Sequence, residues 1–206
     1  MWNNNCHMIF RQMKLKDKDF ELYITAGELS AIVDRIAESL EHDLKNSADV
    51  DGLIVCPVMT GAFVFAADLV RRLRMPLEVR PVRYASYSGM CSTGTVRCEQ
   101  PFPESVKGRE VLIVEDVIDS GLTVGRMLED LKPLGPKSVK VCTLLMKPGM
   151  FKGGYRVDYI GKEIGDEFIV GYGMDYDEQG RGLPEVWRAF GYKPDNNHKQ
   201  KTGSTR

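Results

Sequence analysis

The chain contains 206 residues, of which 43% are hydrophobic and 28% charged, and its formal net charge at pH 7 is −1. A chain of this length buries enough surface for the hydrophobic core of one domain, so neither a disulfide framework nor a structural metal is required. The composition excludes a mainly disordered protein. The near-neutral charge provides no overall electrostatic attraction to nucleic acid.

The cysteine pattern and the lengths of the apolar runs indicate the cellular compartment. The cysteines are odd in number and none has the two-residue separation of a zinc or redox motif, so reduced thiols in a cytosol account for them best; they are Cys6, Cys56, Cys91, Cys98 and Cys142. Residues 1–10 lack the apolar run of a secretory signal, and no apolar stretch approaches the roughly 20 residues that span a bilayer. We expect a cytoplasmic protein without membrane contact.

The first part of the chain predicts an arm followed by a helix. Residues 1–20 mix polar and apolar side chains around a charged cluster, and we expect them to form a loosely held arm. Thr25 and Glu28 have the spacing of a capping box, and apolar side chains recur after them at helical period. This pattern predicts an amphipathic helix over about residues 26–44.

The rest of the chain alternates between strands and helices. Apolar stripes predict helices over 63–73 and 124–132, and short apolar runs predict strands over 53–58, 77–84, 111–114, 139–146 and 168–174. This order is typical of an α/β fold with a mostly parallel sheet. A long loop rich in Ser, Gly and Thr lies between residues 84 and 110, and such loops are usually functional. The polar tail 193–206 is expected to be disordered.

The segment from Val111 to Thr123 carries the strongest functional signal. An apolar strand leads into Glu115 and Asp116, and Asp119 follows, before a turn of small residues that opens a helix. Ligands bind at the carboxyl ends of strands in open parallel sheets, and a helix N-terminus attracts anions. Carboxylates would repel a phosphate unless a divalent cation or sugar hydroxyls intervene, so a ribose phosphate is the favoured ligand. The alternative is an ordinary acidic strand end followed by an N-capped helix.

This segment reads Glu-Asp-x-x-Asp-Ser-Gly-x-Thr, which is neither a Walker loop nor a dinucleotide-binding fingerprint. It resembles the signature with which type I phosphoribosyltransferases bind 5-phosphoribosyl 1-pyrophosphate. The residues of the motif are most similar to those of the 6-oxopurine branch, the hypoxanthine(-guanine) phosphoribosyltransferases. Three further segments agree: 58–63 resembles the family's pyrophosphate loop, 144–147 its purine-contacting lysine, and 168–175 its base-stacking and metal-binding strand.

The resemblance covers about residues 25–192 and implies a fold. The expected architecture is the α/β type I phosphoribosyltransferase fold, a parallel central sheet flanked by helices with a small hood subdomain. The whole chain, 1–206, would form one phosphoribosyltransferase domain. Residues 25–150 would form mainly the core, and residues 151–192 the hood and purine-binding segment, with the amino-terminal arm completing the hood.

The resemblance also implies roles for individual residues. Phosphoribosyl pyrophosphate would be bound by Glu115, Asp116, Asp119, Ser120, Gly121, Leu122, Thr123, Thr60, Gly61 and Arg181. The purine would be bound by Lys147, Phe168, Ile169 and Asp175, with Lys147 donating to O6 and Phe168 stacking on the ring. Asp119 would be catalytic, because an ionised carboxylate facing N7 can accept or share the proton as N9 attacks the ribose. Bound Mg²⁺ would be held by Glu115, Asp116 and Asp175, and Ser86 and Tyr87 would belong to a flexible loop that closes over the site.

One position departs from the family pattern. Many members carry a lysine in the pyrophosphate loop where this chain has Thr60. Backbone amides of Thr60 and Gly61 are therefore expected to bind pyrophosphate, in a turn that in the family contains a non-proline cis peptide at the Met59–Thr60 position. Three side chains also have plainer interpretations: Lys147 as a solvated lysine, Phe168 as a core residue and Asp175 as a surface acid.

The implied function is purine salvage. The reaction would be the Mg²⁺-dependent transfer of 5-phosphoribosyl from phosphoribosyl pyrophosphate to N9 of hypoxanthine, or guanine, giving IMP or GMP and pyrophosphate. A xanthine-preferring transferase is one alternative. Another is an RNA-binding regulator of the same fold, whose basic face would comprise Arg71, Arg72, Arg74, Arg80 and Arg83. We expect self-association as a dimer or tetramer and no nucleic-acid partner.

Overall fold

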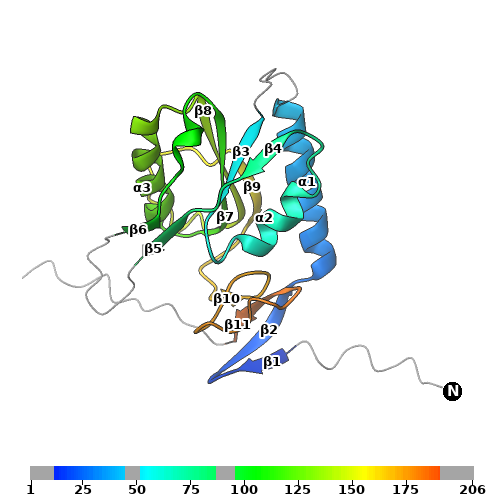
Figure 1. The fold of residues 1–206 in the computed structure, drawn as a ribbon. Coiled ribbons are helices and arrows are strands. Elements are labelled where there is room, and N and C mark those ends of the chain that lie inside the picture. Colours follow the sequence, from blue (N-terminus) through cyan, green and yellow to red (C-terminus); the bar gives the residue numbers. More distant parts are fainter. Residues whose placement is uncertain (1–11, 45–51, 87–95, 191–206) are drawn as a thin grey trace, which may run out of the picture.

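A five-stranded parallel sheet forms the centre of the molecule (Figure 1). The computed structural model describes residues 12–44, 52–86 and 96–190. The strand order is β4-β3-β7-β8-β9, and the strands are β3 (Leu53–Pro57), β4 (Leu77–Val79), β7 (Glu110–Ile118), β8 (Ser138–Met146) and β9 (Tyr159–Glu163). Strand β7 lies between β3 and β8 and is parallel to both. Its carboxyl end is therefore at the middle of the sheet edge where α/β proteins bind ligands.

Helices cover both faces of this sheet (Figure 1). Helices α1 (Ala26–Leu44) and α2 (Phe63–Val70) contribute to one buried apolar cluster, and α3 (Leu122–Leu131) contributes to another. The structure also has two short 3-10 turns, η1 (Glu104–Val106), which buries Val106, and η2 (Lys132–Leu134). The predicted α/β fold with helices flanking a parallel sheet is confirmed.

Helix α1 begins where the capping box predicts. The Thr25 N–H donates to Glu28 Oε2 at 2.9 Å, and the Glu28 N–H donates to Thr25 Oγ1 at 3.2 Å. Two N–H groups that the first turn leaves without helical partners are thereby satisfied. The buried side chains of the helix recur at helical spacing, from Leu29 to Leu44, and form the face that packs on the sheet.

A second, antiparallel sheet forms the hood. Its order is β1-β2-β11-β10, with β1 (Gln12–Leu15), β2 (Lys18–Ile24), β10 (Ile169–Val170) and β11 (Val186–Ala189). The predicted union of the amino-terminal arm with the carboxyl-terminal segment is therefore seen. The arm itself differs from the expectation of a loose segment: from residue 12 it consists of paired strands, because β2 buries Phe20 and Ile24 and pairs with β11.

The predicted strand 77–84 is wrong in extent, because two strands of different sheets replace it. Strand β4 ends at Val79, and β5 (Arg83–Ser86) pairs antiparallel with β6 (Val96–Gln100). Pro81 lies between β4 and β5 and has no N–H to donate to a ladder. Strand β6 lies in the region expected to be an unbroken loop. Residues 87–95 of that region lie outside the described residues.

The predicted strand 168–174 is also too long. It contains a strand at Ile169–Val170 alone, because positive φ angles at Gly171 (103°), Tyr172 (51°) and Gly173 (104°) turn the chain. The sequence pattern did not predict β9, which belongs to the central sheet although residues 151–192 were assigned to the hood. Its five residues include a central glycine and alternate only weakly.

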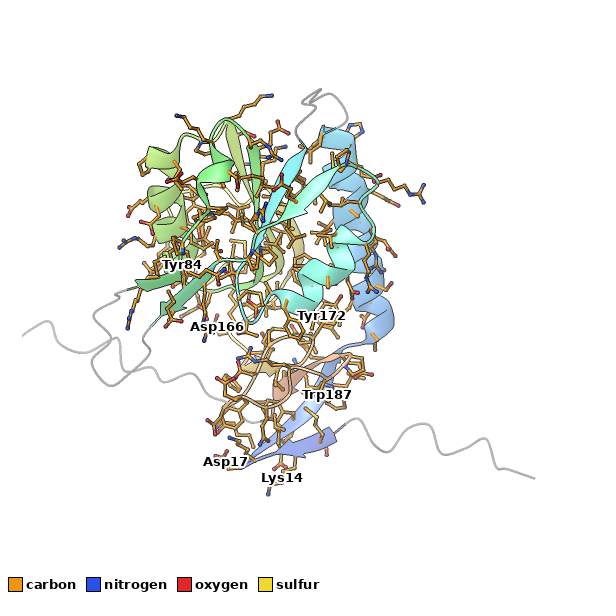
Figure 2. The ribbon with its side chains drawn as sticks, viewed as in Figure 1. Lys14, Asp17, Tyr84, Asp166, Tyr172 and Trp187 are labelled. Atoms are coloured by element: carbon orange, nitrogen blue, oxygen red, sulfur yellow. The ribbon has the colours of Figure 1, made fainter. Side chains whose placement is uncertain are left out.

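Tyr172 connects the hood to the core. Its side chain lies at the boundary between the hood and helix α2 (Figure 2), and its hydroxyl donates to the Asp68 carboxylate on α2. Beside it, a Cβ on Gly173 would lie 2.1 Å from the carbonyl oxygen of Gly61, so the two backbones are in direct contact. The turn after β10 is thereby held against the turn between β3 and α2.

Several sequence predictions fall partly or wholly outside the described ranges. Cys56, Cys98 and Cys142 are free thiols, whereas Cys6 and Cys91 lie outside those ranges, as does the tail 193–206. Among the helices that the structure describes, none is both long and apolar enough to cross a membrane.

Candidate active site

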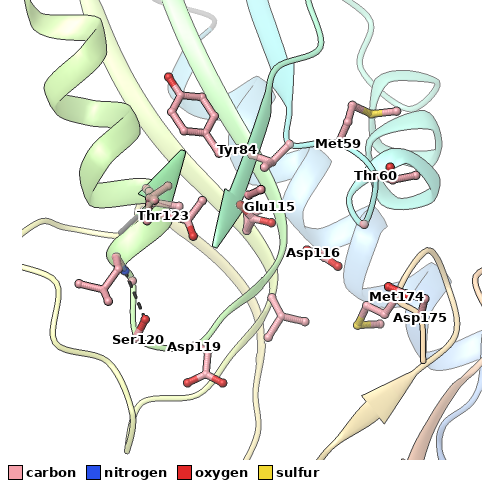
Figure 3. Close-up of a pocket in the computed structure, with 18 of the residues that line it drawn as sticks. Met59, Thr60, Tyr84, Glu115, Asp116, Asp119, Ser120, Thr123, Met174 and Asp175 are labelled. Atoms are coloured by element: carbon pink, nitrogen blue, oxygen red, sulfur yellow. Dashed lines mark hydrogen bonds between the residues drawn. The ribbon is translucent and has the colours of Figure 1, made fainter. Parts of the chain in front are cut away.

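A cavity of about 1100 Å³ opens at the carboxyl end of the central sheet (Figure 3). Its walls come from the β3–α2 turn, the β5–β6 hairpin, the carboxyl-terminal part of β7, the turn before α3 and the hood segment that follows β10. The predicted site residues that line it are Thr60, Gly61, Glu115, Asp116, Asp119, Ser120, Gly121, Leu122, Thr123, Asp175 and Arg181. Folding thus gathers the acids, the small-residue turn and an arginine around one space.

Glu115 is a buried acid within β7, which continues to Ile118, beyond the predicted strand 111–114. It is 8% exposed, and its Oε2 atom is buried without a hydrogen-bond partner among the described residues. Burial, together with the neighbouring Asp116 carboxylate, raises the pKa of Glu115 well above its ordinary value. A buried carboxyl oxygen without a partner is costly to folding, so its place in a cavity indicates a ligand-binding role.

Asp116 lies directly against the β3–α2 turn. A Cβ added to Gly61 would fall 2.1 Å from Asp116 Oδ2 and 2.7 Å from its Cγ. Only a glycine at position 61 allows the carboxylate to occupy this place. The turn contains a cis peptide bond between Met59 and Thr60, as the family resemblance implies.

The turn before α3 has the features of an anion-binding site. Gly121 precedes the helix with φ 80°, a left-handed conformation that favours glycine. The Leu122 N–H approaches Ser120 Oγ at 3.4 Å, drawn as a dashed line in Figure 3. Hydroxyls of Ser120 and Thr123 line the same cavity. Backbone N–H groups, hydroxyls and the positive end of the helix dipole therefore meet at one point.

The hood contributes a charged cluster to the cavity. Arg181 Nη2 lies 2.8 Å from Asp175 Oδ1 and 3.4 Å from Glu178 Oε2, and its Nη1 donates to the Gly173 carbonyl at 3.0 Å. Both Asp175 and Arg181 are about one-quarter exposed, so Asp175 is not the free surface acid of the plainer interpretation. Glu178 lines the cavity but was not predicted. Its one signal in the sequence was the acidic run from Asp175 to Glu178.

Lys147 lies outside the cavity wall but contacts it through Asp119. Its Nζ atom lies 3.2 Å from Asp119 Oδ2, and its side chain is 12% exposed. A solvated lysine is therefore excluded in this structure. The pair places a cation and a carboxylate at the same end of the cavity. The resemblance implies this arrangement, with Lys147 facing O6 of a 6-oxopurine and Asp119 facing its N7.

Phe168 and Ile169 do not line the cavity. The ring centroid of Phe168 lies 5.5 Å from that of Tyr176, at an interplanar angle of 85°, and 6.3 Å from that of Phe20. Ile169 is 8% exposed within the hood. Phe168 thus takes part in an aromatic cluster of the hood and is half-buried, so it is not a fully buried core residue. Its stacking role remains a prediction.

Strand β5 contributes to the cavity and ends at the predicted flexible loop. Tyr84 lines the cavity, and its hydroxyl donates to Asp130 Oδ2 at 3.0 Å; no sequence signal distinguished it from the other residues of the predicted strand (Figures 2 and 3). Ser86 is the last residue of β5, but its side chain and all of Tyr87 lie outside the described residues. Their flexible-loop role stays a prediction.

The donor set at the cavity suits magnesium. Within the described ranges, no three or more His, Cys, Asp and Glu side chains are gathered closely enough to hold a metal by themselves. Mg²⁺ usually takes one or two carboxylates and completes its shell with water and ligand phosphate oxygens. The unpartnered oxygen of Glu115, beside Asp116, supplies donors of this kind. The residues therefore fit a magnesium ion that is shared with a phosphorylated ligand.

Comparison with known proteins agrees with this geometry. The family model of the phosphoribosyl transferase domain matches residues 24–177. The hypoxanthine phosphoribosyltransferase of Buchnera aphidicola is 40% identical over 171 residues, which cover 82% of this chain and 96% of that protein. The hypoxanthine-guanine phosphoribosyltransferase of Mycobacterium tuberculosis is 37% identical over 166 residues, which cover 79% of this chain and 82% of that protein.

Solved structures give the same result. The crystal structure of a hypoxanthine-guanine phosphoribosyltransferase from Bacillus anthracis superposes with a TM-score of 0.75 at 34% identity, over 82% of this chain and 96% of that chain. A ternary substrates complex of the Trypanosoma cruzi hypoxanthine phosphoribosyltransferase superposes with a TM-score of 0.76 at 30% identity, over 82% of this chain and 95% of that chain.

The chain belongs to the phosphoribosyl transferase family. The relatives described above are hypoxanthine and hypoxanthine-guanine phosphoribosyltransferases, and the matches extend over most of their length. The resemblance to that branch, and with it the prediction of a phosphoribosyltransferase enzyme, is confirmed.

Proposed function

We propose that this enzyme transfers 5-phosphoribosyl from phosphoribosyl pyrophosphate to N9 of hypoxanthine and guanine, giving IMP or GMP and pyrophosphate in purine salvage. One observation carries the proposal: the Glu115–Asp116 pair, the turn 119–123 and the Lys147–Asp119 ion pair meet at a single cavity. The names of the relatives support the choice of a 6-oxopurine as acceptor.

The sugar phosphate occupies the part of the cavity beside β7 and α3. The N–H groups and hydroxyls of the turn 119–123 bind the 5′-phosphate, with the dipole of α3 behind them. Ribose hydroxyls donate to Glu115 and Asp116, which gives the buried Glu115 oxygen the partner it lacks. These contacts hold C1′ in a fixed position for attack.

The purine binds where Lys147 and Asp119 meet. The ammonium group of Lys147 can only donate hydrogen bonds, so it favours a 6-oxo over a 6-amino group at the base. The Asp119 carboxylate accepts or shares the N7 proton as N9 attacks C1′. Since the two groups are 3.2 Å apart, one bound base can contact both, and their mutual ion pair is exchanged for contacts to the base.

Pyrophosphate departs on the side of the hood. Arg181 and the backbone amides of Thr60 and Gly61 bind the leaving group, and Arg181 offsets its developing charge. Magnesium bound through Glu115, Asp116 and Asp175 would supply further charge neutralisation to the pyrophosphate when present. The Asp175–Arg181 contact of 2.8 Å keeps both groups oriented towards the cavity before the ligand arrives.

An RNA-binding regulator receives no support from the basic cluster. Most of its arginines pair with carboxylates of the same chain, which lowers the field available to a polyanion. The pairs are Arg71–Asp68, Arg72–Asp34, Arg80–Glu78 and Arg83–Glu99.

Nucleotide formation tests the proposal directly. Ultraviolet absorbance is followed with phosphoribosyl pyrophosphate and hypoxanthine, guanine, xanthine or adenine, each with magnesium or with a chelator. We expect magnesium-dependent turnover of hypoxanthine and guanine. Faster turnover of xanthine would replace the proposal with the xanthine-preferring alternative. No turnover of any base by folded protein, with a salt-sensitive shift of RNA, would favour the regulator instead.

We also propose a cytoplasmic dimer or tetramer. Light scattering during gel filtration measures the assembly, and a monomer at micromolar concentration would contradict it. The location is tested by fractionation of cells that express the chain.

A further inference from the structure

The segment 147–155 runs along the back of the phosphate-binding turn. The Lys147 N–H donates to the Ile118 carbonyl at 2.9 Å, and the Lys152 N–H donates to the Ser120 carbonyl at 3.0 Å. The Tyr155 hydroxyl donates to the Gly121 carbonyl at 2.9 Å. One short segment thus binds three carbonyl oxygens in the first part of the turn, those of Ile118, Ser120 and Gly121.

These bonds determine where the N–H groups of the turn point. In a trans peptide the C=O of one residue and the N–H of the next point in opposite directions. Carbonyls held towards 147–155 therefore direct the N–H groups of Asp119, Gly121 and Leu122 to the other side. Those residues line the cavity, and Figure 3 shows the Leu122 nitrogen meeting the Ser120 hydroxyl there.

Tyr155 is the one side chain among these donors, and it is tightly packed against Gly121. A Cβ on Gly121 would lie 2.8 Å from the Tyr155 hydroxyl oxygen and 2.6 Å from Cε2 of Phe151. The Phe151 and Tyr155 rings meet edge to face, with centroids 5.3 Å apart at 90°. Burial, and secondarily the charge of Glu115, raises the pKa of Tyr155, so the hydroxyl remains a donor at working pH.

We propose that Tyr155 is a positioning residue for the 5′-phosphate: its hydroxyl holds the Gly121 carbonyl so that the N–H of Leu122, in the same peptide unit, faces the ligand. The Phe151 ring, in edge-to-face contact, holds the Tyr155 ring in this position. The Gly121 carbonyl accepts both this bond and the α3 bond from Gly125 N–H at 2.9 Å, which uses both of its lone pairs. The inference rests on the proposed function, since it concerns the phosphate that the turn would bind.

Tyr155→Phe tests the inference, because it removes the hydroxyl and keeps the ring. We expect the KM for phosphoribosyl pyrophosphate to rise about 3- to 10-fold, the range for loss of one hydrogen bond. Inhibition by IMP, which carries the same 5′-phosphate, should weaken by the same factor. Inhibition by pyrophosphate and the KM for hypoxanthine should each stay within about 2-fold, because neither ligand has a 5′-phosphate.

Tyr159→Phe is the matched control. The Tyr159 hydroxyl also makes a 2.9 Å hydrogen bond to an acceptor, Asp43 Oδ2, but at a site away from the cavity. Tyr159→Phe, like Tyr155→Phe, should lower the stability of the fold by the loss of one hydrogen bond. It should leave unchanged both KM values and the inhibition by IMP and by pyrophosphate. If Tyr155→Phe does not fold, Phe151→Leu, which retains the hydroxyl, should show the same pattern with a smaller amplitude.

The outcomes separate the two proposals. A wild-type protein that forms no nucleotide contradicts the proposed function. Wild-type turnover with equal weakening of pyrophosphate and IMP in Tyr155→Phe, or with no change in either, overturns the positioning role alone. Selective weakening of the two 5′-phosphate ligands supports it.

Discussion

Gly61→Ala probes the contact between the β3–α2 turn and Asp116. The added Cβ would lie 2.1 Å from Asp116 Oδ2, whereas ordinary contact begins at 3.4 Å, so the oxygen must retreat by about 1.3 Å. Displacement of a reacting group by about 1 Å costs on the order of 10² in rate. We therefore expect kcat/KM for phosphoribosyl pyrophosphate to fall about 10²-fold, equivalent to about 2.7 kcal/mol of transition-state stabilisation.

Folding should survive this substitution. The clash is with the far end of a side chain that can rotate, and Gly61 does not have a positive φ angle. The thermal midpoint should therefore change little. Gly27→Ala is the control, since no atom lies within 4 Å of its added Cβ and it replaces a helical glycine. It should keep full activity and an equal or higher thermal midpoint.

A double-mutant cycle assigns the effect to Asp116. Steady-state kinetics are compared for Gly61→Ala, Asp116→Ala and the double variant. Once the carboxylate is gone, Gly61→Ala should cost almost nothing further. Additive losses, or wild-type activity in folded Gly61→Ala, would refute the argument that this glycine serves to place Asp116.

Three further perturbations test the site and the fold. Asp119→Asn should lower turnover by a factor on the order of 10² or more, because an amide cannot take the purine proton; unchanged turnover would leave Asp119 a binding role only. Thr60→Lys should strengthen product inhibition by pyrophosphate about 5-fold through one added charge contact, and unchanged inhibition would remove position 60 from the pyrophosphate site. The hydrogen bond from Tyr159 is the main cause that lowers the pKa of Asp43 below 3.8. It therefore stabilises the fold above that pH and less as the pH falls through the lowered pKa. Urea denaturation should show Tyr159→Phe less stable than wild type at pH 7, with the difference shrinking below about pH 3.8; a constant difference would contradict this assignment.

The elements that the sequence predicted well are those determined by neighbours in the chain. Helix α1 follows from its capping box and apolar stripe, and the segment 111–123 follows from an apolar run that ends in acids and small residues. Predictions failed where a local pattern was interrupted. Pro81 divided one predicted strand, and the positive φ angles from Gly171 to Gly173 shortened another.

The hood and the cavity wall could not be predicted from local sequence patterns alone. Strand β11 pairs with β2, which lies more than 160 residues earlier in the chain, and it has no strong apolar alternation of its own. Glu178 and Tyr84 were identified as cavity residues only from the tertiary structure. The family resemblance alone supplied the purine-binding roles of Phe168 and Ile169; both lie within the hood, where that resemblance places them, and their roles stay predictions.

The sequence by itself determined the three helices, the central strands β3, β7 and β8, and the residue types available for ribose phosphate chemistry, because these depend on spacing along the chain. Tertiary structure decided which of those residues meet. The contacts Lys147–Asp119, Tyr155–Gly121 and Gly61–Asp116 join residues far apart in sequence. Their geometry depends on how strands register and side chains pack in three dimensions, which no local pattern specifies.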